Sequence, residues 1–368
     1  MGNFVQKHAE AVSQYNETVV LAVFPSTSIK KTEITESKRS NLSEIIVYYP
    51  KASNGIKLFR LIKNFRAHRK AFNTGYKLVK EKIGTPEIVH LNVTYPLGIW
   101  ALWLKWRKKI PYVISEHSSG FHILSNHSYP KNILILCKLI LRNSAVLLPV
   151  SENLKNNLKL LSPKSRFSII PNVVDEHLFI PKASENTDCF KLIHISTGVD
   201  EIKNLSGMIR VFEKIKQANL SVTLDIVSDG DTKYAEDLTK SLELKNVVLF
   251  HSTKTTSEIA KMIQESDGLL LFSNYENFPC VIAESLMCGK PVISSDVNGI
   301  PEHLNSLNGI LVKPKDEIAL FEAIKRFIVI KNDFDSTEIR RYALEHFSYA
   351  EVGEKFSQIY DQVARSAK

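Results

Sequence analysis

The chain has 368 residues, of which 44% are apolar and 24% charged, a balance typical of a globular protein long enough for two domains. The sequence excludes a low-complexity chain, and its longest apolar runs are far too short to span a bilayer. The net charge of +9 is unevenly divided: residues 1–182 hold 27 Lys and Arg against 11 Asp and Glu, and the remainder holds 21 against 28. This asymmetry predicts two domains with different partners.

Short apolar runs alternate with longer amphipathic stretches from Thr18 onward, which is the pattern of parallel strands covered by helices. In the first half we expect strands at Val19–Phe24, Glu44–Tyr49, Ile88–Leu91, Tyr112–Ser115, Ala145–Val150 and Arg166–Pro171, with helices at Leu58–Lys82, Pro96–Lys109 and Lys131–Asn143. After a linker at Pro181–Phe190 we expect strands at Lys191–Ser196, Val222–Ser228, Val247–His251, Gly268–Ser273 and Pro291–Ser294. Helices are expected between them at Leu205–Ala218, Lys233–Glu243, Ser257–Glu265 and Pro279–Cys288.

This order predicts two doubly wound, Rossmann-like domains, at residues 1–182 and 183–345, that face each other across a cleft at the carboxyl ends of their strands. A last helix is expected at Glu351–Ala364, within a segment, 346–368, that packs back toward the first domain. The N-terminus lacks the apolar centre and cleavage site of a signal peptide, so we expect a cytoplasmic protein, either free or peripheral on the inner face of the membrane. The four cysteines have no disulfide or metal spacing.

Most of the positive excess lies in Lys57–Lys82, where Leu58, Leu61, Ile62 and Phe65 recur at helical spacing among Lys and Arg. One interpretation is a solvated basic face over a stripe of core residues. The other is a surface for anionic lipid headgroups or for a phosphate-bearing acceptor. Nucleic acid is not an expected partner, because no nucleic-acid-binding module is recognisable. Trp100, Trp103 and Trp106 hint at a membrane-associated acceptor, although helical spacing predicts that Trp103 and Trp106 are core residues.

The strongest local signal is Ser273–Pro291, SNYENFPCVIAESLMCGKP. A buried strand is followed by a short loop, and a helix then opens with Pro279 in its preferred first position and ends at Gly289. The unpaired N–H groups at the start of this helix would face the cleft and form an anion site. Glu276 in the loop and Glu284 in the second turn could accept hydrogen bonds from sugar or ribose hydroxyls.

Glu276 and Glu284 form an E-x7-E element, and ENFPCVIAESLMCGKPVISSDVNGIPEHL resembles the hallmark of the family 4 retaining glycosyltransferases, which have the two-domain GT-B fold. The stretches HISTGVDEIKNLSGMIRVF, LPVSENLKNNL, IIPNVVDEHLF and VHLNVTYPLGIWALWLKWRKKIPYVISEH are similar to the same family. The resemblance covers almost the whole chain. It implies transfer of a sugar, with retention of the anomeric configuration, from a UDP- or GDP-linked donor to a glycan or lipid-linked acceptor, in polysaccharide or cell-envelope glycan synthesis.

The resemblance also implies roles for residues that match. Glu284 would bind the donor ribose and Glu276 the transferred sugar, while Lys203 would neutralise the diphosphate and His117 would face the donor sugar. The backbone from Asn277 through Phe278 and Pro279 to Cys280 would hold sugar and diphosphate. The nucleobase pocket is expected near His251–Lys254, which adds Lys254, and Gly2 is a weak candidate for contact with donor or acceptor. Because a lysine and a helix start supply the positive charge, no metal or other cofactor is expected.

Three features depart from the family pattern. No arginine precedes Lys203 within Thr197–Ile202, so the diphosphate site lacks one cation that the family commonly has. In the family a first strand in the middle of the sheet and a Gly-containing loop precede the helix that GNFVQKHAEAV resembles, whereas this sequence begins in that loop, at Met1-Gly2. We therefore expect the N-terminal domain to lack this first strand and its connection, about 10–20 residues, through a truncated or misassigned start. The alternative is that Met1 is the true start and the domain has fewer strands. Asp229-Gly230-Asp231 resembles a metal-binding DxD, but it follows an expected strand and is interpreted as a turn.

Other functions stay open. A GT-B relative could bind nucleotide sugar or membrane lipid without transferring sugar. A dinucleotide oxidoreductase is disfavoured because no GxGxxG follows any strand. A basic nucleic-acid binder would need a steep salt dependence of binding.

Overall fold

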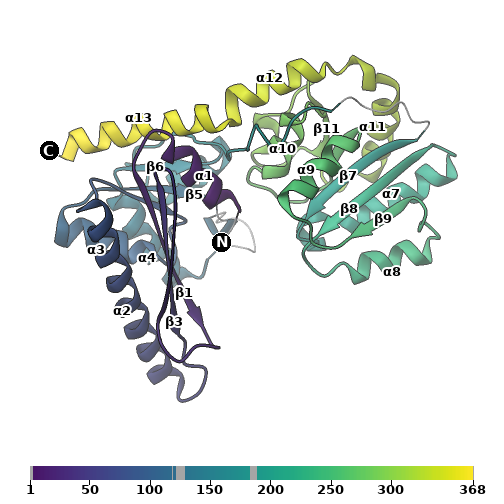
Figure 1. Ribbon diagram of the computed structural model, residues 1–368. Helices are drawn as coiled ribbons and strands as arrows, with labels where there is room; N and C mark the ends of the chain where they lie inside the picture. The colour runs from purple at the N-terminus through teal and green to yellow at the C-terminus, as the bar shows by residue number, and fades with distance from the viewer. Residues whose placement is uncertain (1–2, 118, 122–128, 183–188, 368) are drawn as a thin grey trace.

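The computed structural model describes residues 3–117, 119–121, 129–182 and 189–367. They form two α/β lobes, joined by a pair of helices that run along one side of the molecule (Figure 1). The expected two-domain architecture is confirmed. Among these residues, no helix has both the length and the hydropathy needed to cross a membrane.

The first lobe contains two three-stranded sheets. Their strand orders, with hydrogen-bonded neighbours side by side, are β1-β3-β2 and β4-β5-β6. Their bounds are β1 Thr18–Ser26, β2 Glu33–Arg39, β3 Leu42–Pro50, β4 Val89–Asn92, β5 Tyr112–Glu116 and β6 Val146–Pro149. The helices are α1 Asn3–Ser13, α2 Lys57–Ile83, α3 Gly98–Lys108, α4 Lys131–Asn143 and α5 Glu152–Leu161, with a 3₁₀ turn at Ser119–Phe121. All strands are parallel except β2, and within the described part of the chain no strand joins β1 to β4.

The second lobe contains one parallel sheet of order β12-β11-β10-β7-β8-β9. Its strands are β7 Phe190–Ser196, β8 Val222–Ser228, β9 Val248–His251, β10 Gly268–Leu271, β11 Val292–Ser295 and β12 Gly309–Val312. Its helices are α6 Asp200–Lys203, α7 Leu205–Gln217, α8 Lys233–Ser241, α9 Thr256–Glu265, α10 Cys280–Met287 and α11 Glu317–Ile330, with 3₁₀ turns at Ile300–Glu302 and Lys331–Asp333. The strand order reverses between β7 and β10, which is where ligands bind in open α/β sheets.

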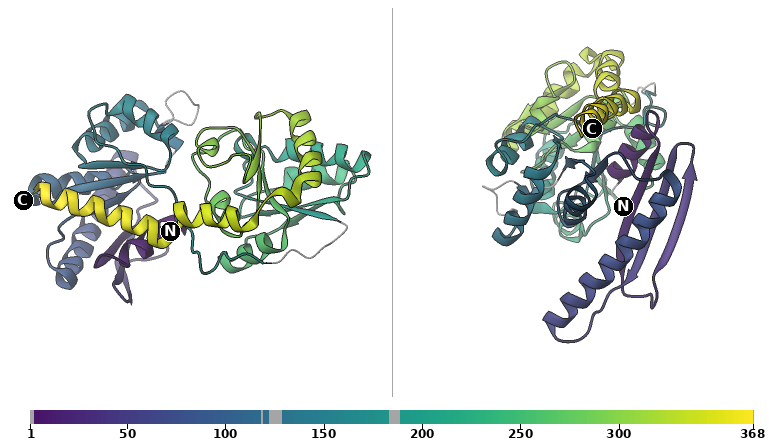
Figure 2. Two further views of the ribbon diagram at one scale, coloured as in Figure 1. Left: turned by 90° about the horizontal axis from the view of Figure 1, so that it is seen from above. Right: turned by 90° about the vertical axis from the view of Figure 1, so that its left-hand side faces the viewer.

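Helix α12 (Ser336–Phe347) lies on the second lobe, and α13 (Tyr349–Ala367) crosses to the first (Figure 2). Val352, Phe356 and Ile359 of α13 are buried in one cluster with Ala11 of α1 and Val113 of β5. Burying side chains of this size stabilises the contact by roughly 1.5–3 kcal/mol each. The helix therefore fastens the two lobes to one another through α1.

Several elements differ from the sequence-based expectation. Strand β2 was not expected, because all seven of its residues are exposed and lack apolar alternation. Strand β12 and helices α11 and α12 were not expected either. Arg166–Pro171 is not a regular strand: it runs beside β6 and forms three backbone hydrogen bonds with it, but these make one isolated bridge, between Leu147 and Phe167, and no ladder. Pro279 is the N-cap residue of α10, so the helix begins at Cys280, one residue later than the expected start at Pro279.

The expected core stripe of α2 is wrong. Leu58, Leu61, Ile62 and Phe65 are exposed, and the residues that α2 buries are Ala71, Phe72, Gly75 and Val79, in the second half of the helix. The expectation of a buried Trp106 is also wrong, since this side chain is 53% exposed, whereas Trp100 is buried. In both cases helical spacing identified an apolar face of a helix, but other elements of the fold pack against only part of that face.

Candidate active site

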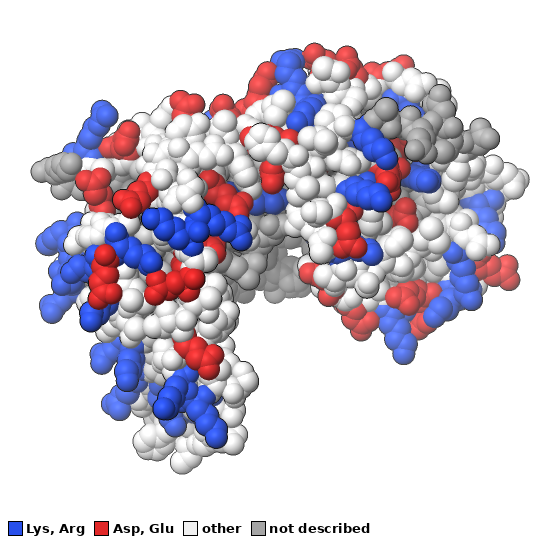
Figure 3. All heavy atoms as spheres, viewed as in Figure 1, with Lys and Arg blue, Asp and Glu red and all other residues white. Residues whose placement is uncertain are grey.

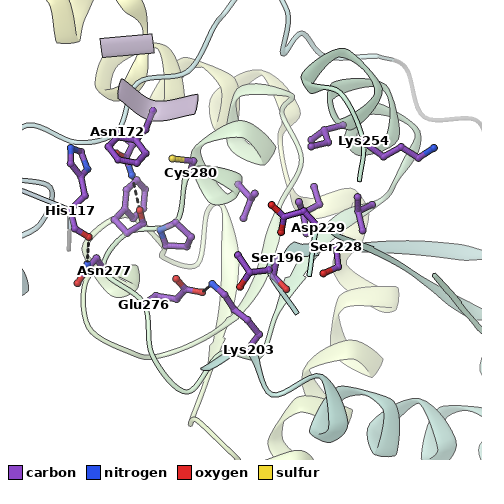
Figure 4. A pocket seen from close by; sticks show the side chains of 18 of the residues that line it. His117, Asn172, Ser196, Lys203, Ser228, Asp229, Lys254, Glu276, Asn277 and Cys280 are labelled. Carbon is purple, nitrogen blue, oxygen red and sulfur yellow. Dashed lines mark hydrogen bonds and ion pairs between the residues drawn. The ribbon is translucent and has the colours of Figure 1, made fainter. Parts of the chain in front are cut away.

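A cavity of about 610 Å³ lies between the two lobes, at the carboxyl ends of the strands. His117, Val150 and Asn172 line it from the first lobe, together with Phe4 of α1. The second lobe contributes the segments that follow β7, β8, β9 and β10 (Figure 4). The cavity is thus at the topological switch point, where the sequence predicted a ligand.

The loop between β10 and α10 forms one wall of the cavity. Asn277, Phe278, Pro279, Cys280 and Val281 all line it. The N-cap Pro279 offers no side-chain cap, so the N–H groups of the first turn of α10 have no side chain to bond them. Such a helix start attracts anions through its N–H groups and its dipole.

Glu276 and Lys203 both line the cavity and are in direct contact with each other (Figure 4). Lys203 Nζ donates to Glu276 Oε1, and Ser273 Oγ donates to the same oxygen at 2.9 Å. Both side chains are largely buried, with 15% of the lysine and 10% of the glutamate side chain exposed. The pair places one cation and one carboxylate side by side, next to the start of α10.

The position of Lys203 is set by a contact between α6 and the end of β10. The Asn274 backbone N donates to Ile202 O at 2.7 Å, and its side-chain amide donates to Glu201 O at 3.1 Å. Asn204 then adopts a left-handed conformation, φ 52°, that ends α6 and lets α7 begin. Asparagine tolerates this conformation better than most residues.

His117 connects the lobes. Its backbone O accepts from Asn277 Nδ2 at 2.6 Å, and its ring lies 4.4 Å from the ring of Phe4 and 5.2 Å from that of His8. Burial lowers the pKa of His117 well below 6.5, and the neighbouring His8 and His90 lower it further. The imidazole is therefore neutral at neutral pH, and it can offer a hydrogen bond without adding positive charge.

Asn172 and Cys280 complete this side of the cavity. Asn172 Nδ2 donates to Phe278 O at 2.8 Å, a second bond from the first lobe to the β10–α10 loop. Burial raises the pKa of the Cys280 thiol to about 12, and the nearby carboxylate of Glu284 acts in the same direction. Cys280 is thus a neutral thiol at physiological pH and lacks the thiolate needed for nucleophilic attack.

Glu284 lies outside the residues that line the cavity. It is 6% exposed and pairs with Lys7 of α1, with 2.8 Å between Nζ and Oε1. The structure therefore separates the two glutamates of the E-x7-E element: Glu276 borders the cavity and Glu284 lies behind its wall. A ribose contact by Glu284 would require the carboxylate to exchange Lys7 for the ligand.

The other expected residues are placed as follows. Lys254 lines the cavity, but its amino group points away from Lys203 and Glu276 (Figure 4) and pairs with Glu258 at 3.4 Å. Gly2 lies outside the described residues. In the Asp229-Gly230-Asp231 segment, Asp229 lines the cavity and Asp231 Oδ1 accepts from Lys233 N at 3.0 Å.

Sequence reasoning missed several lining residues. Ser196, Thr197 and Ser228 directly follow or end β7 and β8 on either side of the switch point. The rule that ligands bind at the carboxyl ends of strands could have selected them. Phe4 and Lys7 carried no comparable signal, because only tertiary packing brings α1 to the second lobe.

Comparison with known proteins agrees with this geometry. Residues 12–178 match the family described as Glycosyltransferase Family 4, and residues 176–343 match that described as Glycosyl transferases group 1. The putative teichuronic acid biosynthesis glycosyltransferase TuaC of Bacillus subtilis (strain 168) is 24% identical over 266 residues. That alignment covers 71% of this chain and 66% of the length of the relative.

Two solved structures share the fold. Sucrose-phosphate synthase from Thermosynechococcus elongatus gives a TM-score of 0.81 at 19% identity, covering 99% of this chain and 93% of its own. Anabaena HepE in complex with UDP and glucose gives 0.72 at 16% identity, covering 98% and 96%. These likenesses show that the two lobes and the cleft between them have the GT-B fold. The chain belongs to the family 4 glycosyltransferases.

Proposed function

We propose that this chain is a retaining glycosyltransferase that moves a sugar from a UDP- or GDP-linked donor to a glycan or lipid-linked acceptor, in cell-envelope or polysaccharide synthesis, without a metal ion. The observation that carries the proposal is the Lys203–Glu276 pair in the cavity that also contains the start of α10, where the N-cap Pro279 makes no side-chain hydrogen bond. The similarity to TuaC, a putative teichuronic acid biosynthesis glycosyltransferase, supports the proposed role in cell-envelope synthesis.

The proposed donor site follows from the charges. The diphosphate would lie between Lys203 and the start of α10, where Cys280 and Val281 line the cavity. When the bond between the sugar and the diphosphate breaks, negative charge develops on the departing phosphate. A fixed cation and fixed N–H donors at that place each stabilise the transition state by roughly 3 kcal/mol, on the precedent of oxyanion sites. They supply the charge that a metal ion would otherwise bring.

Glu276 and His117 are proposed to hold the transferred sugar. In the ligand-free arrangement Glu276 is bonded to Lys203 and Ser273. Binding of the diphosphate would draw Lys203 away and free one carboxylate oxygen for sugar hydroxyls. Neutral His117 faces the same space from the first lobe. In the retaining reaction the C1–O bond to phosphate breaks as the acceptor oxygen bonds to C1 on the same face, and the acceptor proton passes to the departing phosphate.

The first test is calorimetric titration of the chain with UDP and with GDP, in buffer that contains EDTA. Tight binding of one nucleotide, lost in Lys203→Ala and kept in the exposed control Lys240→Ala, is the expected result. Transfer is then measured with that nucleotide's sugars, and the anomeric configuration of the product is read by NMR. Binding without transfer would favour the non-catalytic relative, and activity that requires added Mg²⁺ would overturn the metal-free mechanism.

A further inference from the structure

The first turns of α2 carry an apolar surface that the described part of the chain leaves largely exposed. Ile56, Leu58, Phe59 and Leu61 are 70%, 64%, 69% and 58% exposed, and Ile62 and Phe65 are 42% and 52% exposed. Single exposed apolar residues are ordinary, but six within ten residues form a continuous patch of the kind that marks an interaction site. We call residues 56–66 the α2 tip.

The α2 tip projects because the helix is longer than the sheet that it covers. Twenty-seven residues make a helix of about 40 Å, and only its second half packs on β1 and β3. Figure 2 shows the first turns extending beyond the strands. Leu58, Leu61, Ile62 and Phe65 recur at helical spacing and Phe59 lies beside them, so the first turns carry one broad apolar face, and its side chains are largely exposed.

The tip is nevertheless an ordered part of the fold. Asn64 Oδ1 accepts from Ala52 N at 2.8 Å, and Asn64 Nδ2 donates to Ala52 O at 3.2 Å. Arg60 Nη1 donates to Ser53 O at 3.0 Å, and Phe65 stacks on Trp100 with ring centroids 6.1 Å apart. These contacts hold the loop before α2 against the helix, so the apolar side chains are presented on a rigid support.

The charge around the tip selects the partner. Residues 51–80 contain nine Lys and Arg and no Asp or Glu. Within the described ranges, none of Lys57, Arg60, Lys63, Arg66, Arg69 and Lys70 forms an ion pair with a carboxylate. Exposed Lys30, Lys31 and Lys51 lie in the loops at the same end of the sheet, with Glu33 offsetting one of these charges.

We propose that the α2 tip inserts into an anionic lipid surface, with its apolar side chains among the acyl chains and its Lys and Arg on the headgroups. Apolar side chains bracketed by basic ones are what interfacial helices use, and each basic group adds attraction to anionic lipid. A protein partner would need acidic groups to match this surface, and a second copy of the chain docked tip to tip would bring like charge against like.

The position of the α2 tip relates membrane insertion to sugar transfer, and this step rests on the proposed function. α2 follows the carboxyl end of β3, the end of the strands at which the cavity also lies. Figure 3 shows the lower part of the first lobe, with its Lys and Arg, standing clear of the second lobe, so the space between them opens toward the tip. A lipid-linked acceptor could then enter the cleft from the membrane on which the tip is seated.

The experiment is flotation of the purified chain with vesicles of phosphatidylcholine alone and of equal parts phosphatidylcholine and phosphatidylglycerol, in low salt and in 0.5 M NaCl. We expect binding to the anionic vesicles only, weakened by salt. Phe59→Ser/Ile62→Ser and Lys63→Glu/Arg66→Glu should each reduce the partition coefficient by about tenfold or more. The matched controls Ile318→Ser/Val329→Ser and Lys240→Glu/Lys245→Glu change exposed residues of the second lobe and should bind like the unaltered chain.

Thermal unfolding of each variant establishes that it folds, and nucleotide titration of the same preparations separates this proposal from the proposed function. Equal binding by tip and control variants would overturn the assignment to α2, and no binding of the unaltered chain would overturn the membrane proposal. If sedimentation equilibrium showed a dimer that the Phe59→Ser/Ile62→Ser variant abolishes, the tip would be a self-association surface instead.

Discussion

Lys7 in α1 and Glu284 in α10 form a buried ion pair across the two lobes, in which Lys7 Nζ also lies 5.1 Å from the centre of the Phe179 ring. Both side chains are at most 7% exposed. A buried charge without its partner destabilises the folded protein, so removing either residue alone leaves the other as an uncompensated charge. The pair links the helix that carries Phe4 into the cavity to the helix whose start is the proposed phosphate site.

Lys7→Met should destabilise the protein because it leaves Glu284 buried without a cation. Breaking a buried pair costs roughly 3–5 kcal/mol, which lowers the melting temperature of a lobe of this size by about 6–15 °C. The double variant Lys7→Met/Glu284→Leu removes both charges and should recover most of the loss. Calorimetry measures all three proteins. Arg341→Met, which breaks an exposed pair with Glu338, is the control and should change little.

Glu284→Ala should weaken binding of the nucleotide by about 1.5–3 kcal/mol if the carboxylate accepts charge-assisted bonds from ribose. Isothermal titration checks this at a temperature where the variant is folded. Lys7→Met is the matched control, because it breaks the same ion pair and leaves the carboxylate in place. If both variants lose affinity equally, the pair acts by holding the lobes together, and Glu284 has no contact with the donor.

Lys203→Ala should lower kcat by about 10²–10³-fold, which corresponds to the loss of one fixed charge at the leaving group. Lys203→Arg keeps the charge and should retain more activity, unless the larger guanidinium displaces Glu276. The comparison is made on kcat and KM separately, because a group that acts on the transition state changes kcat. Equal kcat for the alanine variant and the unaltered chain would remove Lys203 from the mechanism.

The sequence was sufficient to predict the two-domain fold, since alternating apolar runs and amphipathic stretches place most strands within two residues. The sequence also predicted that Lys203, Glu276 and the start of α10 lie at one cleft, because all three follow strands near the switch point, and all three line the cavity. It could not show that Glu284 is covered by Lys7, which is 277 positions away. Nor could helical spacing distinguish the exposed half of α2 from its buried half, because overhang depends on the length of neighbouring strands.

Stability should fall as the pH is lowered from 6.5 toward 4, because buried histidines must take up protons when the chain unfolds. Burial lowers the pKa of His8 to about 4 and that of His90 to about 3, so both are neutral in the folded protein. In the unfolded chain each histidine binds a proton as the pH falls through about 6.5. Because the pKa is lower in the folded protein, the contribution of each neutral histidine to stability is complete above pH 6.5 and is lost progressively below it. For His8 the full effect is of the order of 3 kcal/mol.

His8→Leu should flatten this dependence, and melting temperatures between pH 4.5 and 8 measure it. His177→Leu removes an exposed histidine and is the control that should leave the slope unchanged. A slope that persists in His8→Leu would assign the effect to other groups, among which His90 would be tested next.

Gly299→Ala should disturb the cavity without changing any residue that lines it. Gly299 has an ordinary φ of −89°, so the substitution adds no backbone strain, but its new Cβ would lie 2.1 Å from Asn277 O and 2.8 Å from Ser151 Cβ. Such contacts force the β10–α10 loop to move, and Asn277 carries the hydrogen bond to His117 across the lobes. A misplacement of about 1 Å in an active site can cost on the order of 10²-fold in rate.

We therefore expect Gly299→Ala to lower kcat with folding preserved, whereas the control Ser306→Ala, in an exposed turn shortly after Gly299, should leave kcat unchanged. Full activity in Gly299→Ala would mean that the loop's position is not critical, and would weaken the assignment of Asn277–Cys280 to the donor site.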